Sequence, residues 1–218
     1  MSVEPLNEAL LSAASPWGAP VQVLEETSSS NDELLRMGEE GAPAGTLVFT
    51  DRQTAGRGQF RRPWASAPGL GLWFSLLLRL EINDGTIPSL SAFAAVAVAQ
   101  TAGALGIADC GIKAPNDVLI AGRKAAGILI ETRMGKSPAS FAVVGIGLNV
   151  NHARQDFPPE LQDRATSLAL ASGALHDRNR VAALLLTHLG ENERLLRENP
   201  QALLARWNQL LIPTLVPA

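Results

Sequence analysis

Residues 53–76, QTAGRGQFRRPWASAPGLGLWFSL, hold three arginines and four glycines within two dozen positions. Arg57, Arg61 and Arg62 carry planar, permanently charged guanidinium groups, which match the geometry of carboxylates and phosphates. Gly56 and Gly58 let the backbone adopt positive φ angles or approach a ligand closely. This composition predicts a loop that grips an anion, although a solvent-exposed hairpin with chance arginines has the same composition.

Two further segments place polar residues in apolar surroundings. Residues 111–131, GIKAPNDVLIAGRKAAGILIE, place Lys124 where strand alternation can turn it inward, and a buried lysine needs an anionic partner. The alternative for Lys124 is an exposed hairpin position, the commoner location of lysine. Asn149 lies in the apolar run VGIGLNVN, where a buried amide requires hydrogen-bond partners. Because the loop, the lysine and the asparagine each lie beside a buried strand, we expect one shared site.

The elements that would position this site are predicted from apolar periodicity and capping residues. Strands are predicted over residues 20–26, 45–53, 70–80 and 140–151, and two more, joined by an Ala-Gly-Arg turn, over 117–132. Helices are predicted after the caps at 29–31, over 88–106, over 178–198 and over 201–211. This mixture predicts an α+β fold. Residues 1–218 are expected to form a single domain with a core over about 20–211.

Composition restricts the class of protein. A net charge of −3 argues against broad electrostatic binding to nucleic acid, which needs a basic face. The one cysteine, Cys110, cannot form an internal disulfide, and the apolar runs are too short, or too interrupted by polar residues, to span a bilayer of roughly 20 apolar residues. We therefore expect a cytoplasmic protein with no nucleic-acid or membrane partner, and an N-terminus too short for a helix-turn-helix domain. The histidines, His152, His176 and His188, lack metal-ligand spacing and are expected at the surface or at caps.

Four segments in this order resemble the catalytic domain of biotin protein ligases, also called biotin–[acetyl-CoA-carboxylase] ligases: TSSSND, residues 53–76, KAPNDVLIAGRKAAGILIE and VGIGLNVN. The resemblance implies a mixed β-sheet flanked by helices, related to the catalytic folds of class II aminoacyl-tRNA synthetases and lipoate ligases. It implies that biotin and MgATP give biotinyl-5′-adenylate and pyrophosphate. Biotin then passes to a lysine of the biotin carboxyl carrier protein of acetyl-CoA carboxylase. Relatives include monomers and dimers, so a monomer or homodimer is expected.

The resemblance also implies roles for individual residues. Lys124 and Arg57 would be catalytic, with Lys124 contacting the reacting carboxyl and phosphate groups. The implied biotin-binding residues are Ser29, Ser30, Asn31, Gln53, Arg57, Gly58, Gln59 and Lys124. The implied nucleotide-binding residues are Trp64, Asn116 and Asn149, and the implied metal ligand is Asp117. Since the reaction joins two anions, a loop rich in arginine and an inward lysine suit it.

Several positions depart from the usual family pattern. Ser30 replaces a threonine, Gln59 an arginine found in many members, Arg61 a frequent glycine, and Ala114 a tryptophan. These changes are expected to alter how binding of the adenylate is shared among the site residues. The segment after Trp207 is too short for the small C-terminal β-barrel of typical members. We therefore expect either a minimal catalytic domain or a shortened form with weakened ATP use.

Two other functions remain open. Lipoate or octanoyl transfer uses a related fold, but a thiol-based transferase needs a nucleophilic cysteine, and Cys110 is far from the loop in sequence. A non-catalytic sensor of biotin or its adenylate would fit the loss of the tryptophan at position 114 and of the barrel. Biotin-dependent exchange between ATP and pyrophosphate would distinguish an enzyme from a sensor. Replacing biotin with lipoate would distinguish the two ligases.

Overall fold

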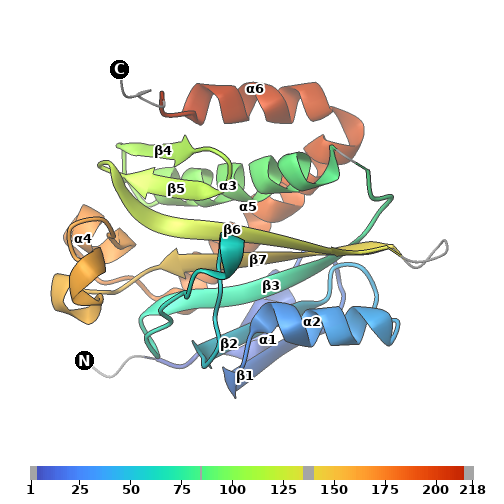
Figure 1. Cartoon of the computed structure of the whole chain (residues 1–218), viewed down its shortest axis with the longest axis horizontal. Helices are drawn as coiled ribbons and strands as arrows, with labels where there is room; N and C mark the ends of the chain where they lie inside the picture. Colours follow the sequence, from blue (N-terminus) through green and yellow to red (C-terminus); the bar gives the residue numbers. More distant parts are fainter. Residues whose placement is uncertain (1–3, 84, 135–139, 214–218) are drawn as a thin grey trace.

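The structure is a computed structural model that describes residues 4–83, 85–134 and 140–213. Its centre is a seven-stranded sheet in the order β1-β2-β3-β7-β6-β5-β4 (Figure 1). β1 and β2 pair in parallel, and the other neighbours pair antiparallel, so the predicted mixed sheet is confirmed. The strands are β1 (Val21–Thr27), β2 (Leu47–Gln53), β3 (Gly71–Arg79), β4 (Cys110–Lys113), β5 (Asp117–Ile120), β6 (Arg123–Arg133) and β7 (Phe141–Asn149).

Helices cover both faces of the sheet. They are α1 (Glu8–Ala14), α2 (Ser30–Glu39), α3 (Thr86–Ala104), α4 (Leu168–Ser172), α5 (Arg178–Glu198) and α6 (Pro200–Leu210). The predicted helices correspond to α2, α3, α5 and α6. The sequence did not predict α1, α4 or β4, which have only four to seven residues and are too short for a clear period. Leu6 and Leu11, which precede the predicted core, are buried in it.

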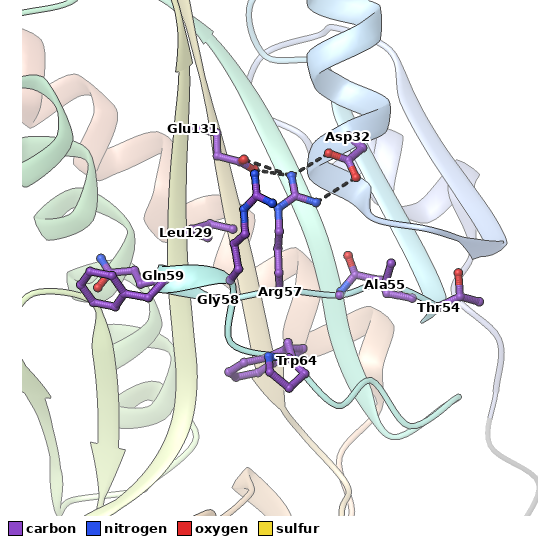
Figure 2. A pocket seen from close by; sticks show the side chains of 14 residues that line it. Asp32, Thr54, Ala55, Arg57, Gly58, Gln59, Trp64, Leu129 and Glu131 are labelled. Carbon is purple, nitrogen blue, oxygen red and sulfur yellow. Dashed lines mark hydrogen bonds and ion pairs between the residues drawn. The ribbon is translucent and has the colours of Figure 1, made fainter.

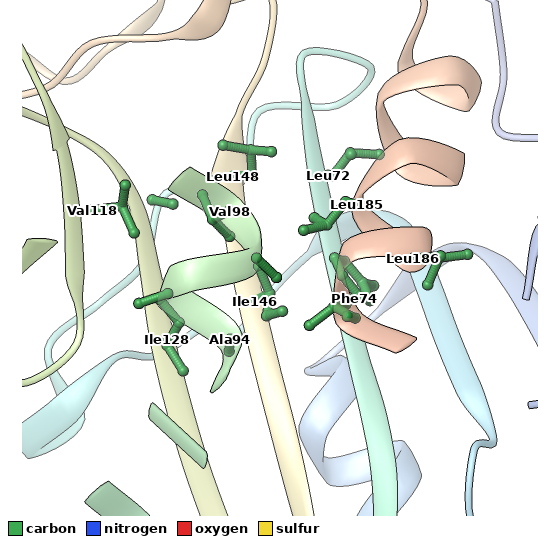
Figure 3. Packing of buried hydrophobic residues seen from close by; sticks show 14 of the residues in the cluster. Leu72, Phe74, Ala94, Val98, Val118, Ile128, Ile146, Leu148, Leu185 and Leu186 are labelled. Atoms are coloured by element: carbon green, nitrogen blue, oxygen red, sulfur yellow. The ribbon is translucent and has the colours of Figure 1, made fainter. Parts of the chain in front are cut away.

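One face of the sheet carries the main hydrophobic core. Alternate residues of β3 and β7, such as Phe74 and Ile146, point toward α3 and α5, as Figure 3 shows. Burying a large apolar side chain of this kind stabilises the fold by roughly 1.5–3 kcal/mol. The expectation that no apolar run is long enough to span a bilayer is wrong for α3, which by length and composition is apolar enough to cross a membrane. In this structure 67% of its apolar window is buried. Because α3 packs on α5, α6 and β6, its apolarity has an explanation within this core.

The opposite face of the sheet is only partly covered. There α2 contributes Leu34 and Leu35 to a smaller apolar cluster with Val48, Leu77 and Val143. Strand alternation places a second set of residues on this same face, beyond the end of α2. These residues are Trp73 and Ser75 of β3, Gly127, Leu129 and Glu131 of β6, and Gly145, Gly147 and Asn149 of β7. The loop between β2 and β3 and the segment after β7 lie against this part of the sheet.

Candidate active site

The arginine loop, residues 54–70 between β2 and β3, folds back on itself. The backbone amide of Gly58 donates to the carbonyl of Arg62 at 2.8 Å, and that of Trp64 donates to Gly56 at 2.9 Å. The turn between them needs left-handed backbone at Phe60 (φ 57°) and Arg61 (φ 56°). This folding brings Trp64 back beside Gly56 and over one face of the sheet.

The loop forms one wall of an open cavity of about 840 Å³ (Figure 2). Five predicted site residues line it: Gln53, Arg57, Gly58, Gln59 and Trp64. The opposite wall includes Asp32 of α2 with Leu129 and Glu131 of β6. The arginine loop, α2 and β6 therefore share one cavity, whereas Lys124 and Asn149, which were expected in the same site, do not line it.

Arg57 is held by two carboxylates of the protein. Its Nη1 and Nη2 donate to the two oxygens of Asp32 at 2.8 and 2.6 Å, and Nη2 donates to both oxygens of Glu131 at 3.0 Å (Figure 2). The hydrogen bond from Arg57 lowers the pKa of Asp32, although burial partly opposes this. The same bond raises the pKa of Arg57. A ligand anion must therefore displace a carboxylate or share this guanidinium.

Neutral polar side chains next to Glu131 form a hydrogen-bonded cluster. Oε1 of Gln53 accepts from the backbone amide of Ser30 at 3.0 Å and lies 3.2 Å from its Oγ. Nδ2 of Asn31 donates to Glu131 at 2.8 Å, while its Oδ1 accepts from Ser75 Oγ at 2.5 Å. Ser75 Oγ also lies 2.8 Å from Ser30 Oγ. We call Ser30, Asn31, Gln53 and Ser75 the recognition cluster.

Two features of the backbone hold the recognition cluster in place. Ser29 is the buried N-cap of α2, although its side chain makes no capping hydrogen bond. This cap starts the helix at Ser30, so that Ser30 and Asn31 face the sheet. Gly145 leaves room for the carboxamide, because a Cβ there would lie 2.3 Å from Oδ1 of Asn31. The position of Asn31 thus depends on the absence of a side chain in β7.

Lys124 lies at the other end of the site. Its Nζ forms an ion pair with Asp117 of β5 at 2.5 Å and lies 5.2 Å from the centre of the Trp64 ring. The lysine is about one-third exposed, so the predicted anionic partner exists but the side chain is not fully buried. Trp64 thereby connects the arginine loop to the hairpin that carries Lys124.

The two predicted asparagines bind backbone carbonyls beside this end of the site. Nδ2 of Asn149, at the end of β7, donates to the carbonyl of Thr166 at 2.9 Å and lies 3.5 Å from that of Lys124. Nδ2 of Asn116 donates to the carbonyl of Ile128 at 2.9 Å. Asn149 therefore lies close to the backbone of Lys124, near the start of β6. The Asn116 side chain binds further along the same strand, at Ile128.

Residues 22–149 match the model of the biotin/lipoate A/B protein ligase family, and this range includes all of the first three segments described above and most of the fourth. The chain belongs to this family. The bifunctional ligase/repressor BirA of Bacillus spizizenii is 46% identical over 156 residues, which are 72% of this chain and 47% of that protein. The chain thus spans about half the length of that relative. The biotin–[acetyl-CoA-carboxylase] ligase of Mycobacterium tuberculosis is 36% identical over 189 residues, 84% of this chain and 67% of that protein.

The fold of this biotin/lipoate ligase family member agrees with solved structures. The biotin protein ligase of Aquifex aeolicus, solved in complex with biotin and ATP, superposes with a TM-score of 0.75 at 29% identity. The match covers 88% of this chain and 78% of that one. The predicted catalytic fold, a mixed sheet flanked by helices, is therefore confirmed.

Some residues of this site were not predicted from the sequence. Asp32, Ser75 and Glu131 have partners in the site that are distant in sequence, and Glu131 lies 74 positions from Arg57. A partial signal was present. Glu131 is the polar end of the apolar run GILIE, and Ser75 is a lone hydroxyl in the run LWFSLLL. Each could have been flagged as a buried polar group in need of a partner.

The expected surface position of His152 is wrong. Its side chain is 2% exposed and stacks on Phe157 with ring centres 4.9 Å apart. It also meets Trp73 edge-on, and Trp73 in turn meets Trp64. Burial lowers the pKa of His152 to about 4, so the ring is neutral at physiological pH. It acts here as an aromatic packing residue beside the site.

Proposed function

We propose that this protein activates biotin with ATP and transfers biotin to a lysine of the biotin carboxyl carrier protein of acetyl-CoA carboxylase. The observation that carries the proposal is the joint position of Arg57, Lys124 and the recognition cluster on one sheet face. Arg57 and Lys124 are cations that could bind the carboxylate of biotin and the phosphate of ATP. The recognition cluster is neutral and could bind the uncharged polar ring of biotin. The relatives named above, which include a biotin ligase solved with biotin and ATP, support it.

In the first step, a carboxylate oxygen of biotin attacks the α-phosphorus of ATP, and pyrophosphate leaves with the electrons of the broken P–O bond. Both reactants are anions, so their approach has to be compensated by positive charge. Lys124 and Arg57 would supply it by exchanging Asp117 and the acidic pair Asp32 and Glu131 for ligand oxygens. Because these cations are already positioned, little reorganisation is needed when the ligands arrive.

The uncharged parts of the substrates would contact the neutral part of the site. Hydrogen-bonding groups of Ser29, Ser30, Asn31 and Gln53 suit the ureido ring of biotin, which carries N–H donors and a carbonyl acceptor. Gly58 and Gln59 would lie over the carboxylate end of biotin. For the nucleotide, Trp64 offers an aromatic surface, and Asn116 and Asn149 offer amide groups. These placements support biotin and ATP as the two ligands.

A magnesium ion is part of the proposal, with Asp117 as its protein ligand. Magnesium is usually held by one or two carboxylates together with substrate phosphates and water, so a single aspartate fits this requirement. Within the described ranges, no group of three or more His, Cys, Asp or Glu residues could form a complete metal site. When bound, the ion would neutralise phosphate charge. Asp117 would orient it beside Lys124.

In the second step, the amine of the carrier lysine attacks the carbonyl carbon of the adenylate, and AMP leaves as the C–O bond breaks. The attacking nitrogen loses its proton as the amide forms. The open cavity beside the arginine loop gives a carrier side chain a route to the adenylate. We also propose a cytoplasmic location without a nucleic-acid partner, supported by the net charge of −3. The proposed unit is one catalytic domain, as monomer or homodimer.

The test is a pair of assays on the purified protein. Exchange of labelled pyrophosphate into ATP should require biotin, and a carrier domain should then receive biotin on its lysine. Exchange that lipoate supports as well as biotin would instead favour a lipoate ligase. Biotin binding without exchange would favour a sensor. Absence of biotin binding would refute the proposal.

A further inference from the structure

A continuous hydrogen-bond chain connects the arginine loop to the recognition cluster. It starts at Arg57, which donates to Glu131 at 3.0 Å, and continues from Asn31 Nδ2, which donates to Glu131 at 2.8 Å. Ser75 Oγ lies 2.5 Å from Asn31 Oδ1 and 2.8 Å from Ser30 Oγ. Ser75 is fully buried, and Ser30 and Asn31 are 3% and 4% exposed. Water therefore has little access to replace a missing partner in this chain.

The chemistry of the partners sets the direction of each hydrogen bond. Glu131, paired with a guanidinium, is a carboxylate and only accepts, so the nitrogen of the Asn31 amide must face it. The oxygen of Asn31 consequently faces Ser75, whose single hydroxyl hydrogen is used in donating to it. Ser75 can then only accept from Ser30. The carboxylate of Glu131 thus determines the orientation of the Asn31 amide and of the Ser75 hydroxyl.

This direction determines what the cluster offers to a ligand. The hydroxyl hydrogen of Ser30 is used within the cluster, toward Gln53 Oε1 at 3.2 Å or Ser75 Oγ at 2.8 Å. Toward a ligand, Ser30 can therefore only accept, from a donor such as a ring N–H. Gln53 Oε1 is held by the backbone amide of Ser30. Its Nε2 lies beside Gly56, another residue of the cavity wall, and can donate to a carbonyl. An acceptor and a donor side by side complement the N–H and C=O groups of a cyclic urea.

We infer that Glu131 and Ser75 are positioning residues that fix the donor and acceptor directions of the recognition cluster, and so its selectivity for a cyclic urea. The inference rests on the proposed function and deepens it. Neither residue needs to touch the ring. Each acts through Asn31 and Ser30, which makes the two residues members of one unit. Residues that act through one chain are expected to give non-additive effects when both are changed.

The experiment is a double-mutant cycle with Ser75→Ala and Glu131→Gln in the full chain, read as Kd by calorimetry. The probe is biotinol, which keeps the ureido ring but has no carboxylate, so the charge of Arg57 does not contribute. Each single variant should raise Kd about tenfold, because a buried polar group loses its partner or its orientation. The double variant should also show about tenfold, whereas independent residues would give about a hundredfold. Ser75→Thr, which keeps the hydroxyl, should restore most of the affinity.

Two matched controls separate positioning from general loosening. Ser91→Ala removes an equally buried serine hydroxyl from α3, and Glu39→Gln removes a carboxylate paired with Arg133 at the surface. Both should leave Kd within about twofold. Additive losses in the cycle, or an equal loss in Ser91→Ala, would overturn the inference alone. A wild-type protein that binds neither biotin nor biotinol would overturn the proposed function, and the inference with it.

Discussion

The indole of Trp64 lies directly against Gly147 of β7. A Cβ at position 147 would come within 2.6 Å of Cε2 of the ring. Gly127, which pairs with Gly147 across β6 and β7, lies under the same ring, where a Cβ would be 2.9 Å from Cζ3. Two paired glycines therefore provide the flat surface on which Trp64 of the arginine loop rests. The position of Trp64 is set by the absence of side chains beneath it.

The first prediction is that Gly147→Ala disturbs the site more than the fold. The added methyl group has to displace the indole, at a cost of roughly 1–3 kcal/mol for an overpacked position. We expect biotin-dependent pyrophosphate exchange to fall at least tenfold while the protein remains folded by circular dichroism. Gly103→Ala is the matched control, since nothing lies within 4 Å of a Cβ there. Exchange at the wild-type rate in Gly147→Ala would show that the contact is unimportant.

The second prediction concerns Lys124. Lys124→Ala should strongly reduce adenylate formation, because Lys124 is the cation that forms an ion pair with Asp117 beside Trp64. Loss of one preorganised charge at a reacting centre reduces a rate by about 10² to 10³. Pyrophosphate exchange measures the loss, and a thermal melt within a few degrees of wild type confirms the fold. Lys113→Ala, at an exposed lysine, should keep normal exchange. Normal exchange in Lys124→Ala would reject the catalytic role.

The placement of the arginine loop could be predicted because it depends on a local pattern. Simple alternation from Gly127, Leu129 and Glu131 would put Lys124 on the other face of the sheet, and an irregularity in the pairing of β5 with β6 at Val118 and Leu119 brings it to Trp64. Strand alternation along β6 and β7 indicates which residues face the site, and the loop lies between two apolar strands. The partners of Arg57 could not be predicted in this way. Asp32 is 25 residues away on α2 and Glu131 is 74 residues away on β6, so only the folded sheet brings them together. From local composition alone, we expected the anion bound by Arg57 to belong to a ligand. In the structure, the carboxylates of Asp32 and Glu131 bind it.

The burial of His152 was missed for a related reason. Most residues near it in sequence, such as Asn151, Arg154 and Asp156, are polar. Its aromatic surroundings come from Trp73 on β3 and from Phe157 in the following turn. The short elements α1 and β4 were missed because a few residues do not define a period. Their stability comes from tertiary contacts, as with Leu11 of α1, which is fully buried.

The third prediction is that Asn31→Ala weakens biotin binding about tenfold or more. The substitution removes the amide that joins Glu131 to Ser75 and leaves both without that partner. A buried polar group without a partner costs roughly 1–3 kcal/mol. Calorimetry with biotin measures the effect, and Asn83→Ala, in the segment before α3, serves as a control for amide loss elsewhere. An unchanged biotin Kd would remove Asn31 from the recognition cluster.

The fourth prediction concerns pH. Because the pKa of His152 is about 4 in the folded protein and roughly 6.5 in an unfolded chain, the unfolded state takes up a proton first as pH falls. The stabilisation from the neutral buried ring is therefore complete above about pH 6.5 and is lost progressively down to about pH 4. His152→Phe has no titrating ring at this position, so its free energy of unfolding lacks this pH-dependent contribution. The free energy of unfolding in urea, measured at pH 7.5, 5.5 and 4.5, should fall more steeply for wild type. Parallel curves for the two proteins would contradict the assignment.

The last prediction concerns Gln59, which lines the cavity beside Arg57 where many relatives have arginine. A hydrogen bond from a charged donor contributes roughly 1.5–3 kcal/mol, and a neutral one about 0.5–1.5. Gln59→Arg should therefore slow the release of preformed biotinyl-5′-adenylate by about five- to tenfold, measured by stopped-flow fluorescence. Gln201→Arg adds the same charge at an exposed position of α6 and should leave the release rate unchanged. Because the added interaction is ionic, the slowing should diminish as salt is raised. Equal or faster release from Gln59→Arg would show that the glutamine already holds the adenylate as well as an arginine does.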